Sequence, residues 1–240
     1  MFPCLVCRSL HVRSPWGSLS PAPPPLDFLA ACALHLIPMV AAPSLDAARP
    51  APSPGEVRIL VHGVSWKDYV IAREALDRPG LRMAFCDGEL ELMSPLRPHE
   101  EWKKNVARLV ELWALERDVP LYGYGSTTFK NALRERGVEP DECYCVGSEM
   151  REWPQIVIEV VHTHPFAIDR RRLYEALGAP ELWIFESGVF TIEYHDGSGY
   201  RRADRSTLLP ELDFTLLAQF VVRSDQPQAL KEWREAIRGG

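Results

Sequence analysis

The spacing of hydrophobic and polar positions changes along the chain, and each spacing predicts one type of element. Over residues 99–117 apolar side chains recur every three or four positions, which is the pattern of one buried helix face. Residues 155–161 are almost entirely apolar and β-branched, as expected for a central strand buried on both faces. Residues 81–85 and 89–93 surround an Asp-Gly pair, which favours a hairpin. The other predicted elements are helices over 65–78, 168–177 and 228–238, and strands over 121–124, 126–129, 142–146, 181–186, 189–195 and shortly after 199.

This order of elements predicts an α/β domain of the α+β kind, with a mixed sheet flanked by helices. The distribution of proline sets its boundary, because residues 1–55 hold 11 of the 21 prolines and only five charged side chains. We therefore predict that 1–55 is a disordered, proline-rich extension and that 56–240 is the folded domain. An alternative is that translation starts at Met39 and the first residues are not part of the protein.

Composition limits the cellular setting and the partners. No run of 18 apolar residues occurs, so we expect no membrane-spanning helix. The formal net charge is -6, so nucleic acid could be bound only through a local basic surface. The six cysteines do not form a paired framework, which indicates a reducing compartment, and we expect a cytoplasmic protein.

Glu159 is the residue that most strongly indicates chemistry. It lies inside the apolar run 155–161, where an unpaired carboxylate is costly and needs a partner or a metal ion. Asp141 follows Pro140 at the start of another predicted strand. If these strands are neighbours, the two acids can share one Mg²⁺ or Mn²⁺ ion, since both metals prefer oxygen ligands. The alternative is that Glu159 forms a structural ion pair with an arginine.

Six segments, spread over roughly residues 60–222, resemble the Uma2 family of the restriction-endonuclease-like, PD-(D/E)xK superfamily. In chain order they are ELELMSP with His99-Glu100 (89–100), GSTTF (125–129), EPDE (139–142), QIVIEV (155–160), Ile168-Asp169 with Tyr174, and LGAPELW (177–183).

The resemblance implies a restriction-endonuclease-like core that hydrolyses DNA phosphodiester bonds. Its motif acids correspond to Asp141 and Glu159, which would bind Mg²⁺ or Mn²⁺ and so activate water for attack on a phosphate. Their carboxylates should then lie about 4–6 Å apart and share one ion. Glu91 and His99 match positions at the edge of the same site. Glu91 could bind or orient metal or water, and His99 could act as an acid or contact phosphate. The alternatives are a solvated strand face for Glu91 and a helix N-terminal position for His99.

One position departs from the family pattern. The superfamily lysine would stand at Val161, and the Uma2 lysine of the following helix corresponds to Arg170. Arginine stays protonated, so it can stabilise phosphate charge but cannot act as a tuned proton acceptor. Either Lys103 or Lys104 could replace the missing lysine.

Three hypotheses follow from these residues. The first is a metal-dependent DNA endonuclease, impaired by Arg170. The second is a catalytically inactive protein with the nuclease fold that binds nucleic acid or has a structural role. The third is a zinc-bound regulatory domain, which needs Cys143, Cys145, His162 and His164 close together. We expect DNA as a partner, with the arginines at 170–172 and 201–205 as candidate backbone contacts, and a homodimer is left open.

Overall fold

The structure of the chain is a computed structural model, and it describes residues 57–150 and 152–239. The proposed extension 1–55, including the alternative start at Met39, lies outside the described residues. No helix in the described part is both long enough and apolar enough to span a lipid bilayer.

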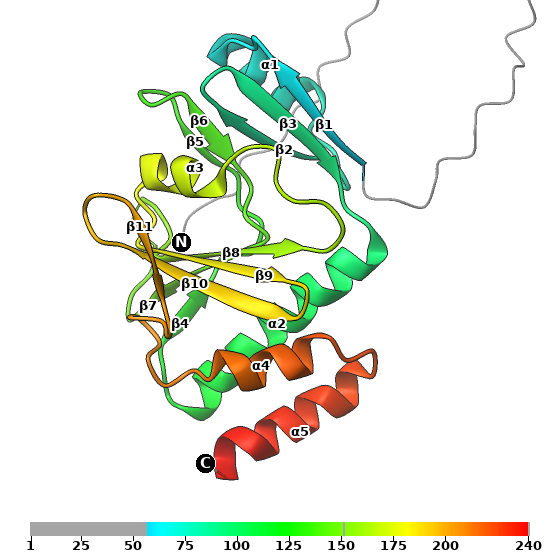
Figure 1. Cartoon of the computed structure of the whole chain (residues 1–240), viewed down its shortest axis with the longest axis vertical. Helices are drawn as coiled ribbons and strands as arrows, with labels where there is room; N and C mark the ends of the chain where they lie inside the picture. Colours follow the sequence, from blue (N-terminus) through cyan, green and yellow to red (C-terminus); the bar gives the residue numbers. More distant parts are fainter. Residues whose placement is uncertain (1–56, 151, 240) are drawn as a thin grey trace, which may run out of the picture. The chain divides into compact units, whose positions relative to one another are not determined.

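The described strands form two sheets (Figure 1). The first, called here the antiparallel sheet, has the order β1-β3-β2-β6-β5, and every neighbouring pair in it is antiparallel. Its strands are β1 (Val57–His62), β2 (Arg82–Cys86), β3 (Glu89–Ser94), β5 (Phe129–Asn131) and β6 (Arg136–Val138).

The second sheet, called here the mixed sheet, has the order β11-β10-β9-β8-β7-β4. Among its described strands only β8 and β9 run parallel, and α3 lies in the connection between them. Its strands are β4 (Leu121–Gly123), β7 (Glu142–Val146), β8 (Ile156–Val161), β9 (Glu181–Glu186), β10 (Val189–His195) and β11 (Tyr200–Ala203).

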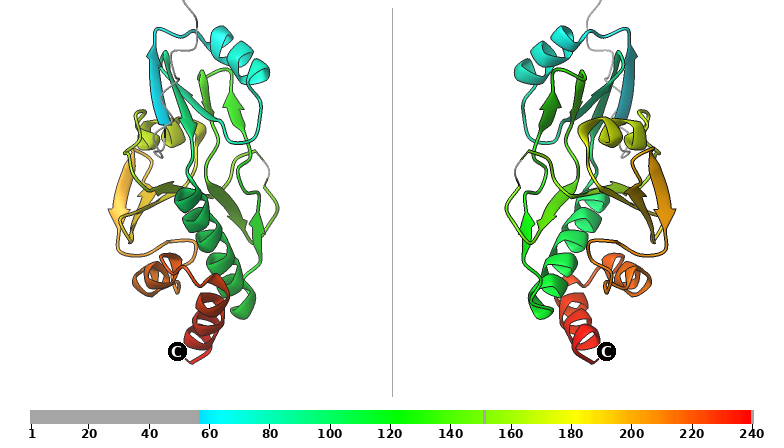
Figure 2. Two further views of the ribbon diagram at one scale, coloured as in Figure 1. Left: turned by 90° about the vertical axis from the view of Figure 1, so that its right-hand side faces the viewer. Right: turned by 90° about the vertical axis from the view of Figure 1, so that its left-hand side faces the viewer.

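Helices cover both sheets (Figure 2). Three of them, α2, α4 and α5, bury one face of the mixed sheet in the largest core cluster. Helix α1 packs its Tyr69 against Met83, Phe85 and Leu90 of the antiparallel sheet. Helix α3 packs on the other face of the mixed sheet, together with residues of β2 and β6. The helices are α1 (Trp66–Ala75), α2 (Arg97–Glu116), α3 (Arg170–Leu177), α4 (Phe214–Val221) and α5 (Gln226–Gly239).

The α+β class is confirmed, but the strands are divided between two sheets where the pattern suggested one. Sequence periodicity identifies strands and not their partners, so it could not separate the sheets. Three elements were also missed, namely β1, β6 and α4. No strand was predicted within residues 130–139, although β6 lies there, because its three residues, Arg136–Val138, are too few to show an alternating pattern. Helix α4 does carry a start signal, since the side chain of Asp213 accepts the N–H of Leu216.

Candidate active site

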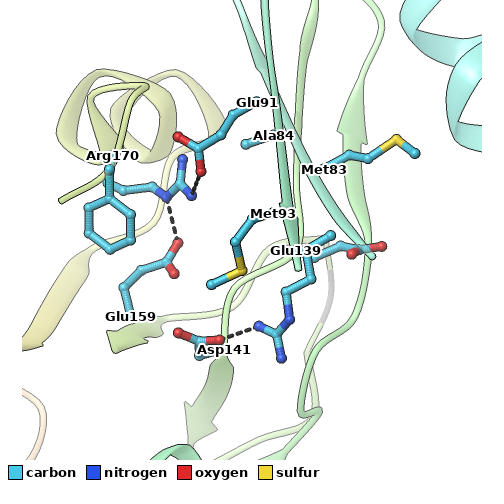
Figure 3. Close-up of a pocket in the computed structure, with 10 residues that line it drawn as sticks. Met83, Ala84, Glu91, Met93, Glu139, Asp141, Glu159 and Arg170 are labelled. Atoms are coloured by element: carbon cyan, nitrogen blue, oxygen red, sulfur yellow. Dashed lines mark hydrogen bonds and ion pairs between the residues drawn. The ribbon is translucent and has the colours of Figure 1, made fainter. Parts of the chain in front are cut away.

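Asp141, the residue just before β7, lies across from Glu159 of β8. Glu142 is paired with Ile158 in the antiparallel register of β7 and β8, so the next pair in that register is Asp141 and Glu159. Ile158 faces the core under α2, α4 and α5. Side chains alternate along a strand, so Glu159 points to the opposite face, towards α3 and the antiparallel sheet. Figure 3 shows both carboxyl groups at one cavity between these elements.

Asp141 is ionised and tightly held. Its Oδ1 forms an ion pair with Arg82 of β2, and its Oδ2 accepts the backbone N–H of Val160 at 2.7 Å. The Nε2 atom of His99 lies 3.3 Å from Oδ2. Burial disfavours the charge of Asp141, but Arg82 and His99 outweigh that effect and lower its pKa. The carboxylate is thus fixed in position from three sides.

Glu159 is less well compensated. Its Oε1 accepts the hydroxyl of Tyr174 at 2.6 Å and lies 3.0 Å from Nε of Arg170. Its Oε2 has no hydrogen-bond partner in the part of the chain that the structure describes. Burial is the main reason that the pKa of Glu159 rises to about 7; Arg170 opposes this rise, and the charge of Asp141 adds to it.

Glu91 reaches the cavity from β3, and both of its oxygens are occupied. Oε1 binds Arg170 at 2.8 Å and Arg58 at 2.6 Å, while Oε2 accepts the backbone N–H groups of Ala167 and Ile168 at 2.7 and 3.0 Å. Burial opposes ionisation of Glu91, but the two arginines outweigh it and lower its pKa. Glu91 therefore anchors the segment that leads into α3 and orients Arg170.

Arg170 connects two acids of the cavity. It is the first residue of α3, whose start is capped by Asp169, and its side chain is only 8% exposed. Its guanidinium contacts Glu91 and Glu159 and lies 4.4 Å from the ring centre of Phe166. It thus compensates buried negative charge in the cavity.

His99 is completely buried near the start of α2. Burial would lower its pKa, but contacts with Asp141 and Glu100 raise it to about 9. His99 is therefore an imidazolium at neutral pH. Because its ring is 0% exposed, it positions Asp141 and cannot contact DNA in this conformation.

Sequence reasoning missed Arg58 and Arg82, which complete the charge balance. Within the described residues, three buried acids of the cavity (Glu91, Asp141, Glu159) contact three arginines (Arg58, Arg82, Arg170). A further acid that lines the cavity, Glu139, is paired with Arg73. Both missed arginines face Met93, which is opposite Arg58 in β1 and opposite Arg82 in β2. Residues 57–62 read VRILVH, so polar and apolar side chains do not alternate there, and the sequence offered no clear signal for Arg58. In the observed strand, Arg58 and Leu60 share one face.

The other candidate cations and ligands lie outside the cavity. Lys103 donates to Ser126 at 2.7 Å, and it does not line the cavity. No group of three or more His, Cys, Asp or Glu among the described residues is arranged to hold a metal ion. The structure therefore does not assemble the zinc set Cys143, Cys145, His162 and His164.

A small divalent ion fits the residues of the cavity. The cavity volume is about 10 Å³, which is room for about one water molecule or ion. Asp141 and Glu159 offer oxygen donors, and Mg²⁺ commonly takes one or two carboxylates while keeping several waters. The Oε2 atom of Glu159 is unengaged in the described structure. Arg82 and Arg170 occupy the neighbouring oxygens, so they would have to yield when an ion binds.

One family model matches most of the part of the chain that the structure describes. The family model Uma2, described as "Putative restriction endonuclease", matches residues 66–219, the stretch that contains all five candidate site residues. No curated protein matches the chain. Since the matched region is well over half of the chain, the protein belongs to the Uma2 family.

Proposed function

We propose that this protein is a metal-dependent DNA endonuclease with Asp141 and Glu159 as ligands for Mg²⁺ or Mn²⁺. The observation that carries the proposal is the meeting of these two carboxylates, from neighbouring strands, at one small cavity. A bound divalent ion would activate water and stabilise charge on the phosphate.

The surrounding residues have separate tasks in this proposal. His99 and Arg82 hold Asp141 in place, and the hydroxyl of Tyr174 holds Glu159. Glu91 has no oxygen left to offer a metal, so it acts through Arg170 as a positioning residue. Arg170 keeps its positive charge at every relevant pH and can neutralise phosphate charge, but it does not accept a proton.

A second function is favoured by the arginines themselves. Arg58, Arg82 and Arg170 balance the three acids of the cavity without any metal ion. This arrangement suits a member of the family that has kept the fold and lost catalysis, and that binds nucleic acid without cutting it. It predicts that divalent ions do not change the stability of the protein.

Nicking of supercoiled plasmid DNA by the purified full chain separates the two functions. We expect nicking in Mg²⁺ or Mn²⁺ and none in chelator, with loss of activity in Glu159→Gln. Glu193→Gln is the matched control, because Glu193 is also buried and paired with an arginine but lies outside the cavity. It should retain activity. Absence of nicking by wild type, together with a melting temperature that no divalent ion raises, would establish the second function.

A further inference from the structure

An open groove lies beside the candidate active site. Its volume is about 580 Å³, and its walls are the turn between α1 and β2 and the loop 126–128. Arg82 and Glu139 line both this groove and the small cavity. Arg82 binds Asp141 on the cavity side, so a molecule in the groove lies one side chain away from the candidate metal ligands.

The groove carries more positive than negative side chains. Arg73, Arg78 and Arg82 line it, against Asp77 and Glu139, in a chain whose net charge is -6. Arg73 is held in place by an ion pair with Glu139 and by a 2.9 Å contact to Asp77. Arg82 is paired as well, with Asp141 and with Glu100 at 3.1 Å, so the local excess of positive charge rests on Arg78. A local excess of this kind is what an acidic protein needs in order to bind an anion.

Arg78 is the cation most available to a ligand. It is exposed, and it forms no ion pair with any described residue. It begins a turn in which Pro79 and Gly80 are central, Gly80 has a φ of +82°, and Leu81 N–H contacts the carbonyl of Arg78 at 3.4 Å. Proline followed by a glycine with positive φ is typical of a type II turn. The turn fixes the backbone of Arg78 at the edge of the groove.

The opposite wall offers hydroxyl groups. Ser126 and Thr128 line the groove, and the ammonium of Lys103 lies 2.7 Å from Oγ of Ser126. Ser126 also donates to the backbone carbonyl of Asp141 at 3.2 Å, and Thr128 donates to Glu139 at 2.7 Å. Each hydroxyl must therefore give up its present acceptor in order to donate to a ligand. Serine and threonine hydroxyls, arginines and lysines are the side chains that contact phosphate oxygens in protein–DNA complexes.

We infer that this groove binds the phosphodiester backbone of DNA and leads it to the cavity. The inference rests on the proposed function for its substrate, but it concerns a different surface. The volumes of the cavity and the groove support separate roles for them. The cavity, at about 10 Å³, has room for an ion, while the groove, at about 580 Å³, is as large as a small-molecule site. The contacts involve backbone phosphates, so we expect little dependence on DNA sequence.

Fluorescence anisotropy of labelled duplex DNA with the full chain, in chelator and at several salt concentrations, tests the groove. We expect Arg78→Ala to weaken binding about 3- to 10-fold and to reduce the salt slope by about 1, as for loss of one phosphate contact. Arg117→Ala is the matched control, because Arg117 is also exposed but lies at the far end of α2. At a helical rise of 1.5 Å per residue, Arg117 is about 27 Å from His99, which lies near the start of α2. It should bind DNA like wild type.

The possible results distinguish failure of the groove proposal from failure of the proposed nuclease activity. Equal affinities of Arg78→Ala and wild type overturn the groove, as does an equal loss in Arg117→Ala, or a wild type that does not bind DNA. Glu193→Gln should bind DNA as well as wild type, because Glu193 lines neither the groove nor the cavity. If binding depends on Arg78 while wild type never nicks plasmid, the groove stands and the proposed nuclease activity fails.

Discussion

Arg170→Met is the substitution that most directly tests the charge balance of the cavity. It replaces a guanidinium that is 8% exposed and contacts Glu91 at 2.8 Å and Glu159 at 3.0 Å. Methionine keeps an unbranched apolar chain of similar length, so lost packing is a minor part of the change. Glu91 retains Arg58, but Glu159 loses its closest cation and stays buried.

The expected loss of stability is large for a single substitution. Removing one partner of a buried ion pair costs about 3–5 kcal/mol, because Glu159 must then remain buried either as a charge without its cation or as an acid protonated above its usual pKa. Whole domains are stable by about 5–15 kcal/mol, so the variant should remain folded but marginal. For a domain of this size the melting temperature should fall by about 6–20 °C, at about 2–4 °C for each kcal/mol.

Urea unfolding at pH 8, followed by tryptophan fluorescence, measures this loss. Arg172→Met is the control on the same helix, because Arg172 is 65% exposed and its partner Asp87 is 33% exposed. A solvated pair of this kind contributes at most about 1 kcal/mol. Adding Glu159→Gln to Arg170→Met should restore part of the stability, since the uncompensated charge is removed. A loss below about 1 kcal/mol for Arg170→Met, or equal losses for Arg170→Met and Arg172→Met, would refute the reasoning.

Three further predictions concern Gly137, Glu142 and a second substitution of Arg170. Gly137→Ala should cost about 1–3 kcal/mol in urea unfolding, because a Cβ there would lie 2.1 Å from the hydroxyl of the fully buried Tyr69; an unchanged midpoint would contradict this. Burial raises the pKa of Glu142 to about 7. Between about pH 4.5 and 7, Glu142 therefore binds more protons in the folded protein than in the unfolded chain. Its ionisation destabilises the folded protein as pH rises through this range. Glu142→Gln should therefore gain stability over wild type across that range, on the order of 2 kcal/mol above pH 7, and a difference that does not vary with pH would exclude this origin. Arg170→Lys should increase plasmid nicking in Mg²⁺, because one ammonium cannot hold Glu91 and Glu159 through separate nitrogens and lysine can shift its pKa; a slower rate would show that arginine is the working residue.

The sequence predicted the central acids because their positions follow from local patterns. Glu159 interrupts an apolar strand, and Asp141 begins the strand before it in sequence, so an antiparallel pairing brings them together. In the predicted strand 89–93, Leu90 and Glu91 must face opposite sides, and the structure places Leu90 in the core under α1 and Glu91 at the cavity. Alternation along one strand was sufficient for this step.

The partners of these acids could not be predicted in the same way. Arg58 and Arg82 lie 33 and 59 residues from the acids that they contact, and no local spacing connects them. Their position depends on the antiparallel sheet, in which β3 lies between β1 and β2. Because the strands were assigned to one sheet and β1 was not recognised, neither arginine could be placed at the cavity.

The charge balance of the cavity couples its two expected ligands in the proposed nuclease. With all three acids ionised, the three arginines and the imidazolium of His99 already exceed them by one positive charge, so a divalent ion at Asp141 and Glu159 would raise the excess to three. A nearby DNA phosphate removes part of that excess, and Arg82 lines both the cavity and the groove where the phosphate would lie. Metal and DNA should therefore each bind more tightly when the other is present, and by linkage the two enhancement factors must be equal.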